Sequence, residues 1–174
     1  YDFGNCFTAA LGYAGNEADI MTKEGIDAYG ANVAYTGDNY GVSVTYGMLE
    51  TAATTDNTFT ALNGYYSFDS GISVSAGIET GDIGGAVAAV DESTAYFVGL
   101  NGALGAGELG VAMGTNGSMT EVGGTITEEL MYEAYYSYPV NDGMTITPLI
   151  FVKEDATVGD ADKTGVMVKT SFSF

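Results

Sequence analysis

The sequence contains no histidine and no arginine, and it has one cysteine and two prolines in 174 residues. Without histidine, the Ser-His-Asp, Cys-His and HExxH arrangements of many hydrolases cannot form. The single cysteine, Cys6, rules out an internal disulfide framework. We therefore expect that the protein is not an enzyme and needs no cofactor.

Positive charge is scarce as well. Four lysines stand against 23 acidic residues, which gives a formal net charge of −19 at pH 7. Nucleic-acid binding needs clustered cations to meet the phosphates, so nucleic acid is excluded as a partner. The acidic excess fits the attraction of cations, or a surface that divalent ions neutralise.

Long hydrophobic runs are also missing. No stretch reaches the ~18 apolar residues of a transmembrane helix, which excludes helical spans only. Hydrophobic residues nevertheless make up 46% of the chain, too many for a disordered protein. Glycine (26 residues), tyrosine (13) and phenylalanine (8) are abundant, a composition typical of strands and turns. The length favours a single domain over residues 1–174.

Apolar residues recur with a period of two, which predicts β-strands. In residues 40–48, for example, Tyr40, Val42 and Val44 alternate with Gly41 and Ser43. Ten strands are predicted, over 7–13, 27–36, 40–48, 58–68, 72–79, 95–104, 108–114, 130–138, 144–153 and 165–174. The stretch 58–68 alternates poorly and is assigned as a strand from its neighbours. The opening stretch YDFGNCFTAALGYAG is interpreted as a strand from its beginning.

The links between these strands alternate in length. Short links of turn residues lie near Asp38, Asp69, Gly105 and Asp142. The longer links carry most of the acidic residues, namely Glu17, Asp19, Glu24, Glu50, Asp56, Asp82, Asp91, Glu92, Glu121, Glu128, Glu129, Glu154, Asp155, Asp160 and Asp162. Short turns at one end and long loops at the other are typical of a membrane β-barrel.

Alternation fits a soluble sandwich, whose apolar face meets a second sheet, and a membrane barrel, whose apolar face meets lipid. Three features favour the barrel. The better strands have about ten residues, enough to cross a bilayer when tilted. The polar face uses Gly, Ser, Thr and Asn in place of Lys and Glu. Tyrosines at strand ends on the apolar face fit an aromatic girdle. These tyrosines are Tyr13, Tyr35, Tyr40, Tyr136 and Tyr138.

The predicted fold class is therefore all-β, an antiparallel up-and-down transmembrane β-barrel with about ten strands in this chain. Lipid satisfies no backbone group, so a spanning sheet cannot keep a free edge. We expect the last strand, GVMVKTSFSF, to seal the sheet and to face lipid with alternate residues. These residues are Val166, Val168, Thr170, Phe172 and Phe174.

This last strand resembles the closing strand of Gram-negative outer-membrane proteins. In those proteins, the insertion machinery recognises the terminal aromatic strand. Together with YPVNDGMTITPLIFVKED, the last strand of this chain resembles the final hairpins of cyanobacterial outer-membrane porins, which have a carbohydrate-porin-like barrel. The resemblance implies an outer-membrane location, lipid and lipopolysaccharide as neighbours, and a homotrimer. The chain would be either a complete ten-stranded barrel or the C-terminal part of a larger one.

The predicted function is passive diffusion of ions and small hydrophilic solutes through a water-filled porin. Charged residues assigned to the small-polar face are expected to line the water path, and three acids against two lysines predict a mild cation preference. These residues are Asp27, Glu79, Glu133, Lys153 and Lys169. The alternative is a non-conducting structural or adhesive protein of the cell surface, either a closed barrel anchor or an acidic β-sandwich.

Three further patterns carry less weight. DADKTG at 160–165 has a calcium-like spacing with Asp160 and Asp162 as candidate ligands, but no later acid completes the loop. A solvated acidic loop is the simpler interpretation, and divalent cations bridging the acidic links to lipopolysaccharide are a hypothesis. GALGAG at 102–107 is interpreted as a hairpin turn. Cys6 is expected to be a small residue on the lumen face.

Overall fold

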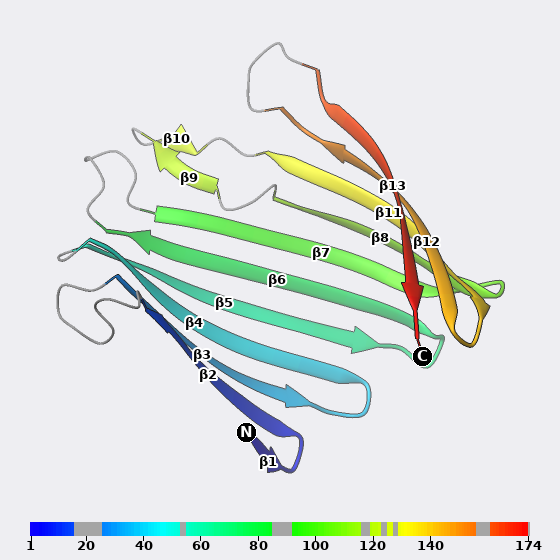
Figure 1. The fold of residues 1–174 in the computed structure, drawn as a ribbon, viewed down its shortest axis with the longest axis horizontal. Helices are drawn as coiled ribbons and strands as arrows, with labels where there is room; N and C mark the ends of the chain where they lie inside the picture. The colour runs from blue at the N-terminus through cyan, green and yellow to red at the C-terminus, as the bar shows by residue number, and fades with distance from the viewer. Residues whose placement is uncertain are drawn as a thin grey trace.

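The structure is a computed structural model that describes residues 1–15, 26–52, 55–84, 92–115, 119–122, 125–126, 129–155 and 161–173. They form one antiparallel sheet in which, apart from two short strands, neighbours in sequence are neighbours in space (Figure 1). The main path of the sheet runs through β1 (Asp2–Gly4), β2 (Phe7–Gly15), β3 (Asp27–Thr36), β4 (Tyr40–Ala52), β5 (Thr55–Ser67), β6 (Ile72–Ile83), β7 (Glu92–Leu104), β8 (Gly107–Thr115), β11 (Leu130–Asn141), β12 (Met144–Lys153) and β13 (Lys163–Phe172).

Two short strands lie off this path. β9 (Met119–Val122) pairs with β10 (Thr125–Ile126), and β9 also pairs with β7 through Ser93 and Thr94. β8 therefore pairs directly with β11. Among the described residues, no helix is long and apolar enough to cross a membrane.

All ten predicted strands are present, as β2 to β8 and β11 to β13. The all-β, antiparallel, up-and-down part of the predicted fold class is thus confirmed. The opening stretch differs from the prediction, because it contains a hairpin between β1 and β2. Asn5 and Cys6 occupy the turn with φ of 52° and 69°, a left-handed pair that matches the twist of a two-residue hairpin. The placement of Cys6 on the lumen face was wrong, since it lies exposed in this turn.

The register keeps each face of the sheet continuous from β2 to β13. We call one side the apolar face; it carries Val33, Val44, Leu62, Ile78, Val98, Val111, Ile150 and Val166. We call the other side the polar face; it carries Asn32, Thr45, Asn63, Asn101, Glu133, Thr147 and Lys169. A slip of one residue between two strands would exchange these sets, so the alternation in sequence specifies the pairing.

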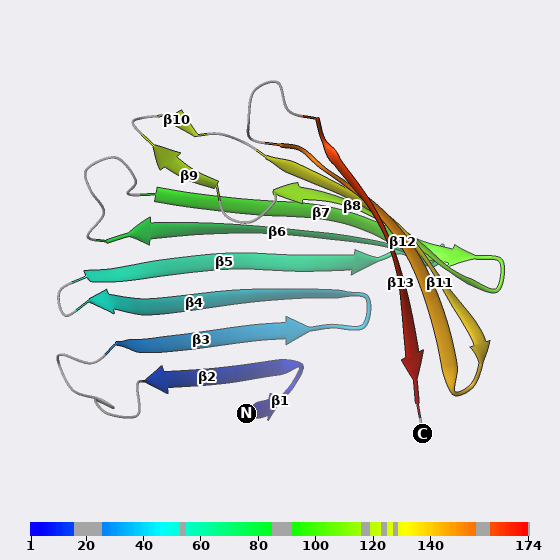
Figure 2. The same cartoon turned by 45° about the horizontal axis from the view of Figure 1, so that its top comes forward.

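The sheet is a single layer, and no described hydrophobic side chain is buried within it (Figure 2). Val33, Leu62 and Ile78 on the apolar face are 53%, 50% and 48% exposed. The sandwich interpretation requires a second layer over this face. No such layer is present among the described residues. The apolar surface of this chain is therefore exposed along the whole sheet.

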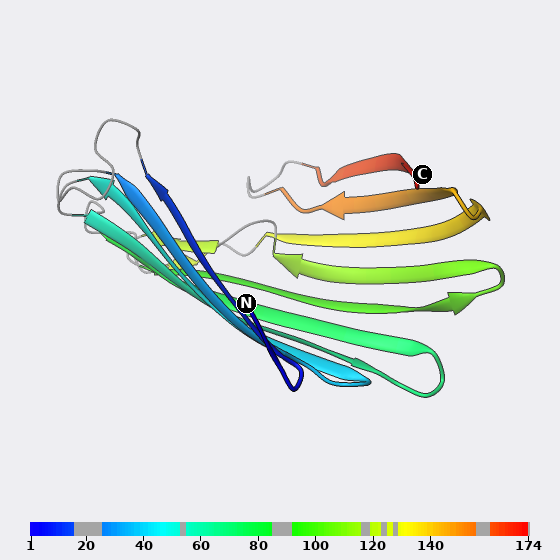
Figure 3. The ribbon, with the colours of Figure 1, turned by 60° about the horizontal axis from the view of Figure 1, so that its bottom comes forward.

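The polar face is the better shielded of the two. In β6, all six polar-face residues are partly buried, whereas all apolar-face residues except Val74 are exposed. In a one-layer sheet, only bending and neighbouring side chains can shield a residue. We infer that the polar face lines the inner side of the bend that Figure 3 shows.

Glycines on the polar face lie beneath aromatic rings of the neighbouring strand. A side chain at each of these glycines would overlap the ring directly opposite it in the register. The pairs are Gly41 with Tyr65, Gly77 with Phe97, Gly81 with Phe59, Gly110 with Tyr135, and Gly165 with Phe151. Such pairs let rings cover the backbone and help a sheet to curve.

The sheet is not closed into a barrel in this structure. The strand order ends at β1 and β2 on one side and at β13 on the other, so the expected sealing of the sheet by the last strand is not seen. Water can hydrogen-bond to an open sheet edge, whereas hydrocarbon cannot. Phe174 of the predicted sealing set lies outside the described residues; Val166, Val168, Thr170 and Phe172 all lie in β13.

Candidate functional site

The charged residues predicted to line a water path fall on the polar face, with one exception. Glu79 lies opposite Ala61, Glu133 opposite Phe151, and Lys169 opposite Thr147. Lys153 shares this face, opposite Lys163 of β13. The prediction thus placed four of its five residues on the same side of the sheet.

The exception is Asp27, whose assignment to the polar face was wrong. It lies opposite Gly15. It shares the apolar face with Tyr29, because the odd-numbered residues of β3 point to that face. Asp27 is only 1% exposed. Its carboxylate accepts hydrogen bonds from the hydroxyls of Tyr13, at 2.9 Å, and Tyr29, at 3.2 Å. A side chain at Gly15 would overlap the Tyr13 hydroxyl and this carboxylate.

Asp27 therefore joins β2 to β3 at the loop end of the sheet, which gives a testable stability effect. We expect Asp27→Ala to lower the free energy of unfolding by about 2 kcal/mol, since it leaves two tyrosine hydroxyls without their charged acceptor. Denaturant titration in detergent micelles measures this loss. The matched control is Asp38→Ala, an exposed residue of a short turn, and equal losses in the two variants would contradict the structural role of Asp27.

Two polar-face charges were missed by the sequence analysis. Glu108, the first residue of the predicted strand 108–114, was not assigned to the water path, yet it lies on the polar face of β8 opposite Ser137 and accepts a hydrogen bond from the Tyr135 hydroxyl at 3.2 Å. Lys163, the first residue of β13, forms an ion pair with Asp155 at 2.7 Å. The alternation within 108–114 already sets Glu108 on the face opposite Leu109, and extending the alternation of 165–174 by two residues would have placed Lys163 on the polar face.

The long strands thus present three glutamates and three lysines on the polar face. The glutamates Glu79, Glu108 and Glu133 belong to β6, β8 and β11, whereas the lysines Lys153, Lys163 and Lys169 belong to β12 and β13. The two signs are therefore segregated along the sheet. Elsewhere on this face, between β3 and β4, small polar side chains form cross-strand bonds, such as Asn32 to the Thr45 hydroxyl at 2.7 Å.

Four acids predicted on the long links lie in strands, because β4 to β7 extend further toward the loops than predicted. Glu50 lies opposite Asp56, and Asp82 lies opposite Glu92. Like charges in direct opposition are unfavourable unless solvent or cations screen them. We call these four residues the acidic rim; they mark the loop end of the apolar face.

Several predicted acids cannot be placed. Glu17, Asp19, Glu24, Asp91, Glu128 and Asp160 lie outside the described residues, and the side chain of Glu121 in β9 is not described. Asp162, the other candidate calcium ligand, is exposed. Across the part of the chain that the structure describes, no three His, Cys, Asp or Glu residues are grouped to hold a metal ion.

Aromatic rings gather at the short-turn end of the apolar face. Tyr35 contacts both Phe7 and Tyr40, with ring centroids 5.0 and 5.4 Å apart, and Tyr136 stacks on Tyr138 at 6.4 Å. The predicted placement of these tyrosines toward strand ends on the apolar face is confirmed. Tyr13 instead lies at the opposite, loop end, where its ring is 5.3 Å from Tyr29.

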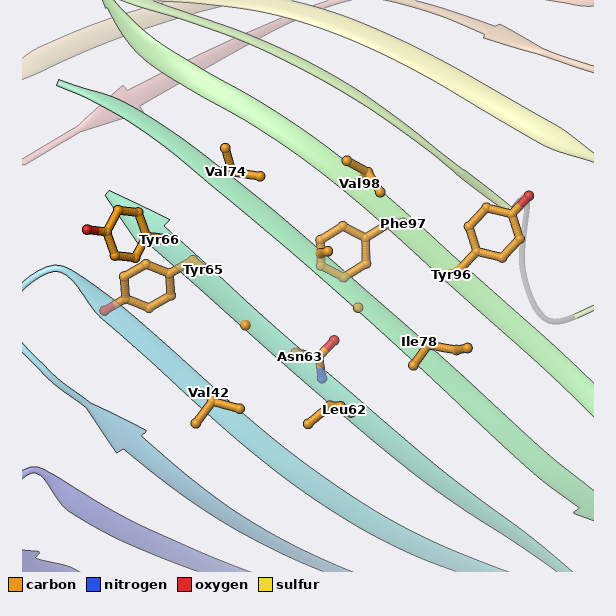
Figure 4. A pocket seen from close by; sticks show the side chains of 13 residues that line it. Val42, Leu62, Asn63, Tyr65, Tyr66, Val74, Ile78, Tyr96, Phe97 and Val98 are labelled. Carbon is orange, nitrogen blue, oxygen red and sulfur yellow. The ribbon is translucent and has the colours of Figure 1, made fainter. Parts of the chain in front are cut away.

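A shallow groove of about 510 Å³ crosses the apolar face between β4 and β7 (Figure 4). Its floor lies over Gly64 and Ala76, which have little or no side chain. The surrounding side chains on this face are those of Val42, Leu62, Tyr66, Val74, Ile78, Tyr96 and Val98. Apart from Asn63 and the tyrosine hydroxyls of Tyr65, Tyr66 and Tyr96, this lining is apolar.

In comparisons with known proteins, no protein-family model matches this chain and no curated protein matches it. The likeness of the C-terminal strands to cyanobacterial porins therefore stays a prediction.

Proposed function

We propose that this chain forms the wall of a transmembrane β-barrel of the outer-membrane type, through which ions and small hydrophilic solutes diffuse passively. The observation that carries the proposal is the distribution of burial. The apolar face is exposed and the polar face is shielded, the reverse of a sheet that folds around a hydrophobic core in water. Hydrocarbon is the surrounding in which such an exposed face is favourable.

The dimensions of the strands support this placement. The ten long strands have between 9 and 13 residues, and about 9–11 tilted residues cross the hydrocarbon of a bilayer. The aromatic girdle ends the apolar face on the short-turn side, where tyrosine hydroxyls reach polar partners. The Tyr136 hydroxyl, for example, donates to the carbonyl of Leu104 at 2.8 Å. The acidic rim ends the same face on the loop side.

The polar face suits the wall of a narrow water path. Its residues are largely Gly, Ser, Thr, Asn and Ala, which leave space and offer hydrogen bonds. A ten-stranded barrel is slim, so the pore admits ions and small solutes only. Because the polar face carries equal numbers of glutamates and lysines on its long strands, the preference for cations rests on the acidic rim at the mouth and on the pairing of Lys163 with Asp155.

The setting proposed is the outer membrane of a Gram-negative cell, cyanobacterial if the resemblance of the last strands holds. Lipopolysaccharide, bridged to the acidic rim by divalent cations, and assembly into a homotrimer belong to the same proposal. The lipopolysaccharide contact is inferred from the charge of the acidic rim, and the homotrimer is inferred from the resemblance.

Ion flow through planar bilayers tests the function. We expect discrete conductance steps from the purified chain, and a reversal potential in a salt gradient whose sign shows mild cation preference. Neutralising the rim with Glu50→Gln and Asp56→Asn should bring this potential toward zero. The exposed turn variant Asp38→Asn on the opposite end is the control. A clear anion preference of the unmodified chain would refute the proposed selectivity.

One observation favours a second candidate, a closed barrel that anchors a surface structure and conducts nothing. The rings of Phe59, Tyr65, Phe97, Tyr135 and Phe151 lie on the polar face, where they would occupy lumen space. A detergent-extracted, folded chain that never conducts would support this candidate over the pore.

A further inference from the structure

The two ends of the strand order are suited to each other. The outermost long strands are β2, with nine residues, and β13, with ten. β2 runs toward a long link and β13 runs away from one. They would therefore meet in antiparallel orientation, as do all neighbouring strands within the sheet.

The register shows how far the strands are displaced across the sheet. From Thr8 in β2, the row of directly opposite residues runs through Ala34, Ser43, Asn63, Gly77, Phe97, Gly114, Met131 and Lys153 to Lys163 in β13. Thr8 lies near the short-turn end of β2, whereas Lys163 is the first residue of β13, at the loop end. The row is therefore oblique to the strands. When the sheet closes, the row returns to β2 at a residue other than Thr8, and we call the number of residues between the two the shift.

Barrel geometry limits the size of this shift. The tangent of the strand tilt equals the shift times the rise per residue, divided by the strand number times the strand spacing. With a rise of about 3.3 Å, a spacing of about 4.8 Å and a tilt of about 35–45°, ten strands require a shift of about 10 to 14 residues. Only even shifts keep the apolar residues of both strands on one face, which leaves about 10, 12 or 14.

The short strand β1 selects among these three values. A shift of about 10 residues would set Phe172 opposite Ala9, but Ala9 already exchanges two backbone hydrogen bonds with Tyr1, at 2.6 and 2.8 Å. A shift of about 14 leaves β13 beside only the last three residues of β2. A shift of about 12 sets Phe172 opposite Leu11 and Ser173 opposite Ala10, so that the described part of the last strand stops next to the residue that Tyr1 occupies.

We propose that β13 pairs with β2 of the same chain, with Ser171 opposite Gly12 and Lys169 opposite Ala14, and closes the ten long strands into a barrel. The inference rests on the proposed function, because lipid is the surrounding that forbids an open edge. In the closed form, β1 and β13 lie end to end along one edge of β2.

Disulfide scanning in detergent micelles tests both the partner and the register. On a Cys6→Ser background, Ser171→Cys is combined in turn with Ala10→Cys, Gly12→Cys and Ala14→Cys, all on the polar face. Directly opposite residues have Cα atoms about 4.5–5.5 Å apart, within the range of a disulfide. We expect S171C/G12C to oxidise best, seen as a reducible mobility shift of the monomer. A side chain at Gly12 meets no atom within 4 Å, so the substitution has room.

The control pair is Gly12→Cys with Gly30→Cys, which lie opposite each other in β2 and β3. If this pair oxidises and no Ser171→Cys pair does, the closure is refuted. A disulfide-linked dimer would also refute it, because a second copy would then occupy the edge. Best oxidation at position 10 or 14 would overturn the register. Conductance of the oxidised protein separates the two proposals, since a cross-linked chain that carries no current keeps the closure and contradicts the pore.

Discussion

Val44→Arg should prevent most of the chain from inserting into lipid vesicles, whereas Ser43→Arg, one residue earlier, should insert nearly normally. Val44 lies on the apolar face between Val33 and Leu62 and is 49% exposed. An arginine facing the middle of the bilayer costs about 2–4 kcal/mol. Ser43 lies on the polar face, opposite Asn63, where an arginine can reach water.

The measurement is the fraction of folded chain in vesicles as a function of urea, read from the mobility of unheated samples in gels. The pair of variants is matched in charge, size and depth along β4, so only the face differs. Equal insertion of the two variants would show that lipid does not touch the apolar face. It would contradict the membrane placement and the pore together.

The second large effect concerns the rings over glycines. Gly110→Val should lower the free energy of unfolding by about 1–3 kcal/mol, because the new side chain overlaps the ring of Tyr135. Removing the ring with Tyr135→Ala should relieve much of this loss, so the double variant should be more stable than the sum of the single effects predicts. Denaturant titration of all four proteins of the cycle measures the coupling.

The control for this cycle is Gly12→Val, also on the polar face, where an added side chain meets no atom within 4 Å. It should lose little stability with or without Tyr135. If the two substitutions at Gly110 and Tyr135 instead prove additive, the ring does not cover the glycine, and the packing of the polar face differs from the structure described above.

The strands and their faces were predictable because a period of two is a local property of the sequence. Tyr40, Val42 and Val44 show it directly, and the pattern recurs in most of the other long strands, whereas β5 alternates poorly and was assigned from its neighbours. The ends of strands were less predictable. Glu50 and Asp56 read as loop residues by their charge, yet they continue the ladder between β4 and β5. Backbone pairing with a neighbouring strand decides such positions, and a single segment does not reveal it.

Asp27 shows a second limit. Its charge suggested a water-facing position, but its parity within β3 places it with Tyr29 on the apolar face. Parity was available in the sequence and was the better guide. This placement is tolerable because the Asp27 carboxylate accepts hydrogen bonds from two tyrosine hydroxyls. One of them belongs to Tyr13 in another strand, so the contact depends on the register between β2 and β3.

The hairpin at the start of the chain shows a third limit. Residues 1–15 alternate well enough to resemble one strand, and the left-handed turn at Asn5 and Cys6 interrupts them. Asparagine is typical of such a turn, but cysteine is not. This short hairpin then determines which part of β2 another strand can occupy, so a small local feature governs how the whole sheet can be completed.

The lack of any buried hydrophobic side chain among the described residues has a consequence for biogenesis. In water, this polypeptide gains less from folding than a globular protein does, because about half of an apolar-face side chain such as Val33 (53% exposed) or Ile78 (48% exposed) stays in contact with water. Under the proposed membrane placement, the remaining driving force would come from contact of the apolar face with a bilayer, and it would depend on bilayer thickness. Before that contact, a holdase would have to bind the nascent polypeptide and keep it from aggregating.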